Sequence, residues 1–158
     1  MAKPQIAAIV TTYFQNSHAD LIVSKFAEGF PSEDGLVPPD VNIVSMYMDQ
    51  LHNKDVGMQI ARDNDIEVFP SIRAALTLET GSEDHWPTAD DWKEGDLSVD
   101  GVILIGEHGD YPHNERDRRL YPRRNMFEQI CGVFSGSGKS VPVFNDKHLS
   151  YSWDDAVW

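Results

Sequence analysis

The chain is poor in cysteine and in basic residues, and it lacks long apolar runs. Cys131 is the only cysteine, so no disulfide can form within the chain, and its place in an apolar helical stripe predicts a buried thiol. The 13 Lys and Arg residues against 26 Asp and Glu residues give a formal net charge of −13. Affinity for nucleic acid comes largely from basic side chains, so we expect no nucleic-acid partner. No run of about 18 apolar residues occurs, so we expect no membrane span.

What the sequence does contain is the composition of a folded domain. Its 158 residues are 41% hydrophobic and 25% charged, which suits one domain with a sizeable core. The first residues, Met1 to Pro4, lack the build of a signal peptide, so we expect a cytoplasmic protein, with a removed leader on a longer natural chain left open. One basic cluster stands out, which we interpret as a solvated, charge-balancing loop with an anionic small-molecule site as the alternative. It consists of Arg116, Arg118, Arg119, Arg123 and Arg124.

Five short apolar runs alternate with segments of helical periodicity. The runs are Ile6–Val10, Val41–Met48, Ile66–Phe69, Val102–Ile105 and Val141–Phe144. Strands alternating with helices predict an α/β fold, a doubly wound parallel sheet of order 3-2-1-4-5 with helices on both faces. The run at Val102–Ile105 is apolar throughout, which is typical of a central strand buried on both sides.

The segments between these runs carry helix start and stop signals. Ser17 with Asp20, Asp55, Ser71 and Ser152 are predicted helix caps. Asn64 is suited to a left-handed helix end, and a further helix is predicted over Arg123–Ser135, ended by residues 136–138. Pro31–Asp40 is predicted to be a surface connection, and Glu79–Ser98, with Trp86 and Trp92, a long functional or mobile loop.

Polar residues gather just after the predicted strands. They are His18, Asp49, Glu107, His108, Asp110, His113, Asp146, Lys147 and His148. Ligands of parallel α/β sheets bind beyond the carboxyl ends of the strands. We therefore expect the residues that follow the first, fourth and fifth strands to converge in a polar crevice.

The order of these parts resembles the amino-terminal Rossmann domain of the glucose–fructose oxidoreductase and inositol dehydrogenase family. The similarity lies in the strand at Val99–Ile105, the turn Gly138-Lys139-Ser140-Val141 and the following Asp146-Lys147-His148. It implies that residues 1–158 form a single Rossmann-like domain, the amino-terminal part of a longer two-domain protein. A missing carboxyl-terminal domain of that kind would also offer a homo-oligomer interface.

The resemblance implies an NAD(P)-dependent oxidoreductase acting on a sugar or polyol-like small molecule. Lys147 matches the position of the family's catalytic lysine, and we expect His113 or His148 to assist proton transfer. Asp49 matches a position that often touches the adenosine ribose. Thr11, Ser17 and Glu107 complete the expected contacts to NAD or NADP.

The chain departs from the family in the loop after its first strand. Residues 11–17 contain no glycine, whereas the family's Gly-x-Gly-x-x-Gly turn lets the backbone approach the pyrophosphate. We therefore expect weak or absent NAD(P) binding. Two alternatives stay open: a non-catalytic Rossmann-like binding module, and a metal-dependent hydrolase or lyase with ligands such as His18, His108, Asp110 and Asp146.

Overall fold

The computed structural model describes residues 2–79 and 96–158. Most of the loop predicted over Glu79–Ser98, with Trp86 and Trp92, therefore lies outside the described residues. None of the helices in the described ranges combines the length and the apolar character needed to cross a membrane.

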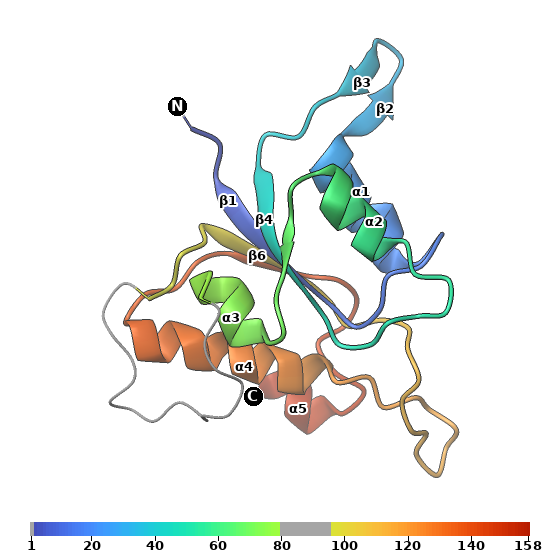
Figure 1. The fold of residues 1–158 in the computed structure, drawn as a ribbon. Helices are drawn as coiled ribbons and strands as arrows, with labels where there is room; N and C mark the ends of the chain where they lie inside the picture. The colour runs from blue at the N-terminus through green and yellow to red at the C-terminus, as the bar shows by residue number, and fades with distance from the viewer. Residues whose placement is uncertain (1, 80–95) are drawn as a thin grey trace.

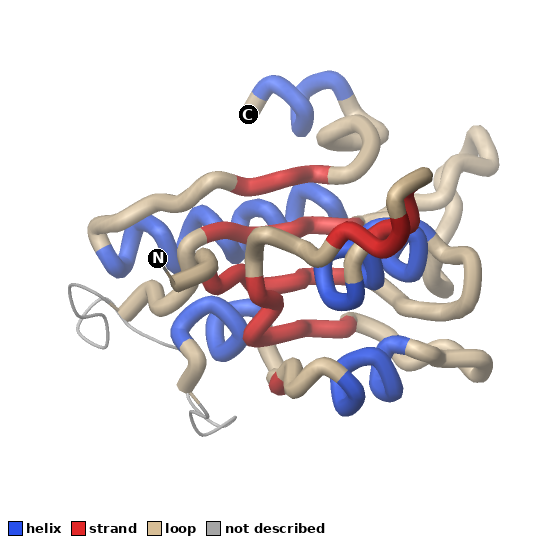
Figure 2. The backbone as a smooth tube through the Cα atoms, turned by 90° about the horizontal axis from the view of Figure 1, so that it is seen from above, coloured by secondary structure: helices blue, strands red, loops and turns tan. Residues whose placement is uncertain are grey.

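A five-stranded, all-parallel sheet forms the centre of the molecule (Figure 1). Its strands are β1 (Gln5–Val10), β4 (Asn42–Met48), β5 (Glu67–Val68), β6 (Gly101–Ile105) and β7 (Val143–Asn145). They lie side by side in the order β5-β4-β1-β6-β7 (Figure 2). If these five strands are numbered 1 to 5 along the chain, their order in the sheet is 3-2-1-4-5. The predicted parallel α/β sheet and its strand order are therefore confirmed.

Helices cover both faces of this sheet (Figure 1). They are α1 (His18–Glu28), α2 (Gly57–Asp63), α3 (Ile72–Thr77), α4 (Arg123–Ser137) and the short α5 (Trp153–Val157). Alternate residues of each strand point to opposite faces, so Ala8 of β1 packs in the core under α1 and α2, whereas its neighbour Ile9 packs in the core under α3 and α4. This alternation produces two apolar cores separated by the sheet.

The central position of β6 explains its unbroken apolar sequence. All five of its residues are buried, and it pairs in parallel with β1 on one side and β7 on the other. The edge strand β7 begins only after Pro142, because proline lacks the N–H that a sheet ladder requires. Pro142 still contributes its carbonyl, which accepts from the N–H of Val102 at 3.0 Å.

The predicted serine caps are confirmed at three helices. Ser17 accepts from the N–H of Asp20, Ser71 from that of Ala74 and Ser152 from that of Asp155. Asp55 also caps α2, with its carboxylate accepting from the N–H of Met58 at 3.0 Å, although it lies one residue before the N-cap position. The left-handed residue after α2 is Asp65, with φ 55°, so the prediction of a left-handed Asn64 is wrong.

Other predicted boundaries need correction. An antiparallel hairpin of β2 (Phe30–Ser32) and β3 (Gly35–Val37) forms where a surface connection is predicted over Pro31–Asp40. The hairpin begins directly after Gly29, which ends α1. Helix α4 continues to Ser137, because the left-handed Gly138 ends it rather than Gly136.

The side chain of Cys131, predicted to be buried, is only half-buried. This partial burial raises the pKa of the thiol.

Candidate active site

The carboxyl ends of the parallel strands meet at one edge of the sheet, where a long segment also begins. Residues 106–122, called the arm below, connect β6 to α4 and extend away from this edge (Figure 1). Two contacts hold the arm to the end of β4. The hydroxyl of Tyr111 donates to the Asp49 carboxylate at 2.6 Å, and the Gln50 side chain bonds both the N–H and the carbonyl of Asp110.

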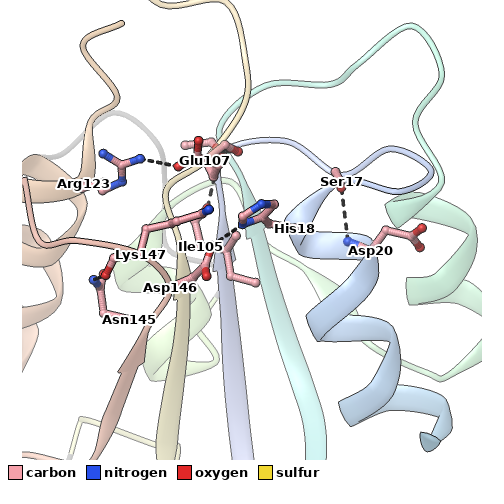
Figure 3. Close-up of polar contacts among 10 residues, drawn as sticks. Ser17, His18, Asp20, Ile105, Glu107, Arg123, Asn145, Asp146 and Lys147 are labelled. Atoms are coloured by element: carbon pink, nitrogen blue, oxygen red, sulfur yellow. Dashed lines mark hydrogen bonds and ion pairs between the residues drawn. The ribbon is translucent and has the colours of Figure 1, made fainter. Parts of the chain in front are cut away.

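Three side chains from distant parts of the sequence meet beside the arm. Nδ1 of His18, the first residue of α1, lies 2.6 Å from a carboxylate oxygen of Asp146, which follows β7 (Figure 3). A carboxylate only accepts, so Nδ1 carries the proton and Nε2 of a neutral His18 is free to accept one. The ring of His108 stands edge-on to that of His18, with 5.2 Å between ring centroids. The structure therefore brings together residues that follow β1, β6 and β7.

His108 has the most constrained environment of the three. Its backbone has a φ of 68°, a left-handed conformation that is uncommon for a residue with a side chain. Its ring also contacts Phe14 edge-on, at 5.3 Å between centroids. The ring atom Nε2 is buried and has no hydrogen-bond partner among the described residues. Backbone strain and an unpaired buried polar atom in one residue are both typical of functional sites.

The charge state of His108 follows from its surroundings. Burial lowers its pKa below the ordinary value of 6.5, and the neighbouring His18 lowers the pKa further. Glu107 and Asp146 raise the pKa and Lys147 lowers it, with smaller effects. His108 is therefore neutral near pH 7, and a neutral imidazole can take up a proton.

An open cavity of about 710 Å³ adjoins His108. This volume lies within the usual range for small-molecule sites, about 300–1,000 Å³. Its wall comes from the segments that follow three strands: Thr12 and Phe14 after β1, residues 50–53 after β4, residues 108–110 after β6, with Arg119 and Tyr121 from the arm. Thr12 Oγ1, like His108 Nε2, is buried with no partner among the described residues. The cavity therefore has two unsatisfied polar atoms among its lining residues.

A buried ion pair supports the base of the arm. Arg123, the first residue of α4, is only 3% exposed and pairs with the carboxylate of Glu107 (Figure 3). The guanidinium also donates to Nε2 of His148 at 3.2 Å and lies 5.0 Å from the ring centroid of Tyr121. A Cβ added to Gly106 would meet Arg123 Cγ at 2.6 Å, so glycine is needed for this close approach.

The residues expected to bind NAD or NADP have their polar atoms engaged within the protein. The Thr11 hydroxyl donates to the Glu107 carbonyl at 2.5 Å, and the Ser17 hydroxyl caps α1. Asp49 accepts from the hydroxyls of Tyr47 and Tyr111, and the side chain of Glu107 pairs with Arg123.

An acidic side chain lies at the start of α1, where the resembling family binds a pyrophosphate. The carboxylate of Asp20 accepts from the N–H of Asn16 at 2.7 Å, so the start of α1 already has an anion of its own. Tyr13, in place of a glycine, is fully buried and packs against Gly57. The residues present do not fit a dinucleotide bound in the manner of the resembling family.

The other predicted site residues are placed less centrally. Lys147 is exposed and has a left-handed φ of 69°, and His148 is exposed and bonded to Arg123. His113 is exposed in the arm, where it forms an isolated antiparallel bridge with Arg119. Asp110 lines the cavity but is exposed. Within the described ranges, no three His, Cys, Asp or Glu side chains are grouped so that they could hold a metal ion.

Sequence reasoning did not select several residues that line the cavity. Thr12, Phe14, His52 and Asn53 follow β1 and β4, so their position after strands could have singled them out. The sequence marks Arg119 only as a member of a basic cluster, whose other members have different surroundings in the structure. Arg116 and Arg118 are exposed, Arg123 is buried, and Arg124 pairs with Glu128 and Asp155.

Comparison of the chain with protein-family models, with curated proteins and with solved structures gave no match. The architecture is that of a Rossmann-like parallel α/β sheet. The cavity and the side chains around His108 are therefore the features from which a function can be inferred.

Proposed function

We propose that this domain is an acid–base enzyme for a small polar molecule, with His108 as the group that accepts the proton. The observation that carries the proposal is the buried, unpartnered Nε2 of His108, a residue that lines the cavity. An unpaired buried polar atom costs free energy. A substrate hydroxyl or a water molecule that reached Nε2 from the cavity would offset that cost by donating to it.

The surroundings of His108 support the role of a general base. Its lowered pKa keeps the ring neutral and able to accept a proton near pH 7. Phe14 and His18 contact the ring, and Asp146 fixes the orientation of His18. His18 and Asp146 are positioning residues in this scheme, and the hydroxyl of Thr12 provides a second polar contact for the substrate.

The proposal requires no dinucleotide. Hydride transfer on a sugar or polyol with Lys147 as the catalytic lysine, which the family resemblance implies, stays a prediction. Asp20 and Asp49 would have to give up their contacts with the protein before a dinucleotide could bind in the family's manner. Proton transfer by His108 needs no such rearrangement.

Hydrolysis of ethyl dichloroacetate tests the proposal, because imidazole promotes hydrolysis of this ester, whose ethoxide is a poor leaving group, by taking a proton from the attacking water. We expect the full chain, without added metal or nucleotide, to exceed the rate of an equal concentration of free imidazole. His108→Gly should lose this activity. Glycine suits the left-handed backbone at this position, and the vacated space should allow added imidazole to restore the rate above that of imidazole alone.

Asp117→Gly is the matched control. Asp117 is exposed, has a similar φ of 57° and does not line the cavity. This variant changes the backbone preference in the same way and should keep the wild-type rate. A wild-type rate no higher than that of free imidazole, or an unchanged rate in His108→Gly, would contradict the proposal.

A further inference from the structure

We infer that the molecule bound in this cavity carries a carboxylate, which pairs with Arg119. The inference concerns the end of the ligand away from His108, and it rests on the proposed function for the reacting end. Arg119 is half-buried and lines the cavity together with His108 and Thr12. Its guanidinium presents a planar set of donors whose geometry matches a carboxylate.

Arg119 has no carboxylate partner in the described part of the chain, although the chain is strongly acidic. Among the residues that the structure describes, none of the ion pairs within 4.0 Å includes Arg119. Arg123 and Arg124, by contrast, both pair with carboxylates. A half-buried guanidinium that stays unpaired in a chain of net charge −13 suggests that its partner is a ligand.

The orientation of Arg119 is already fixed. Its Nη1 donates to the carbonyl of Gly109 at 2.5 Å, which ties the side chain to the residue next to His108. This contact uses one N–H, and the remaining N–H groups are available to a ligand. Little side-chain freedom is then lost on binding, and an ordered guanidinium binds more tightly than a mobile one.

Another residue of the wall adds a donor. Nδ1 of His52 accepts from the N–H of Lys54 at 3.1 Å, so a neutral His52 carries its proton on Nε2. The side chain of Gln50 is already bonded to the backbone of Asp110 at both of its polar atoms. Asp110 brings a carboxylate to the same wall, but it is exposed, and solvent screens its charge. The free groups of the half-buried wall are therefore mostly donors.

The charge of the site favours a carboxylate over a phosphate. Arg119 is the sole Lys or Arg residue among the described lining residues. A phosphate monoester carries nearly two negative charges at pH 7, and a single guanidinium in a strongly acidic protein balances one of them. The start of α1, the other place for a phosphate, already has the negative charge of Asp20 in its first turn.

Matched sets of small molecules test the inference by NMR titration of the isotope-labelled full chain. One set is glycerate, glycerol and glycerol 3-phosphate, and the other is benzoate, benzyl alcohol and phenyl phosphate. In at least one set we expect the carboxylate to bind tightest and to shift the resonances of residues 108–110. Arg119→Gln should weaken binding of that carboxylate by about tenfold and leave the alcohol unchanged.

Two further variants separate the ligand contact from the fold. Arg119→Lys keeps the charge and a donor for the Gly109 carbonyl, so it should retain part of the affinity. Arg116→Gln removes an exposed arginine of the same arm that does not line the cavity, and should change nothing.

Several results would overturn the inference. They are equal or tighter binding of the alcohol or the phosphate in both sets, no binding of either carboxylate at millimolar concentration, and unchanged carboxylate affinity in Arg119→Gln. None of these results depends on turnover. A carboxylate preference together with an unchanged esterase rate in His108→Gly would instead contradict the proposed function and leave the ligand class standing.

Discussion

Glu107→Gln should strongly destabilise the fold, because it leaves a buried arginine without its counter-charge. The side chain of Arg123 is 3% exposed and that of Glu107 is 18% exposed. Glutamine keeps the shape of glutamate and an oxygen that can accept from the guanidinium, but it removes the counter-charge, which neither Nε2 of His148 nor the ring of Tyr121 replaces. Removing one partner of a buried ion pair typically costs about 3–5 kcal/mol. For a chain of this size, we expect the melting midpoint to fall by about 6–20 °C.

Urea unfolding at pH 7, followed by circular dichroism, measures this change, with an unchanged m-value as the sign that the folded state stays compact. Glu128→Gln is the control, since its pair with Arg124 is 36% exposed on both sides, and we expect a loss of about 0.5 kcal/mol or less. Glu107→Gln combined with Arg123→Met should recover much of the stability, because no charge is then left buried. A loss below about 1 kcal/mol in Glu107→Gln, or a double variant no more stable than the single one, would refute the reasoning.

Two other predictions concern stability. Gly57→Ala should destabilise the fold by about 1–3 kcal/mol, because the new Cβ would lie 2.7 Å from the fully buried Tyr13. Gly132→Ala should stabilise the fold by about 0.5–1 kcal/mol, because this position lies inside α4 and a Cβ there would have nothing within 4 Å. Urea unfolding measures both variants, and a change in the free energy of unfolding with the same sign in both would contradict the packing argument. Folding lowers the pKa of His108. Between that lowered pKa and the ordinary value of 6.5, the unfolded chain therefore binds more protons than the folded chain. The free energy of unfolding should decrease as the pH falls through this window. His108→Gln should make this decrease shallower in unfolding curves between about pH 5 and 8, and an unchanged slope would assign it to other groups.

The sheet could be predicted from the sequence because its signals are local. The four residues Val102 to Ile105 are apolar without interruption, and a run this short that follows Asp100-Gly101 favours a strand buried on both faces. The hairpin at Phe30–Val37 carries no such signal, because all of its residues are exposed and proline and glycine lie within it. The left-handed conformation predicted for Asn64 is wrong for a reason that the sequence also does not show. Asn64 uses its side chain to bond the carbonyl of Ile60, and the chain turns one residue later.

The candidate site could be located from the sequence, but its partners could not. Residues that follow parallel strands must lie at one edge, and this rule placed His18, His108 and Asp146 near one another. Which of them pair depends on side-chain directions that no pattern encodes. His108 has a left-handed backbone, which sequence patterns predict at glycine or asparagine rather than at histidine. Arg119 lines the cavity because the arm folds back so that its side chain bonds the carbonyl of Gly109.

The loop after β1 joins a Rossmann-like sheet to a first helix whose N-terminus has a negative charge of its own. In dinucleotide-binding domains a phosphate at this helix balances the partial positive charge of the N-terminus. Here the carboxylate of Asp20, which accepts from the N–H of Asn16, provides that negative charge from within the chain. The N–H of Asp20 donates to the Ser17 hydroxyl that caps the helix. A glycine-rich turn is then unnecessary, so the loop can carry Tyr13 into the core and Phe14 to the wall of the cavity. This loop thus lines the proposed cavity and has no glycine-rich turn, and the fold alone does not identify a ligand.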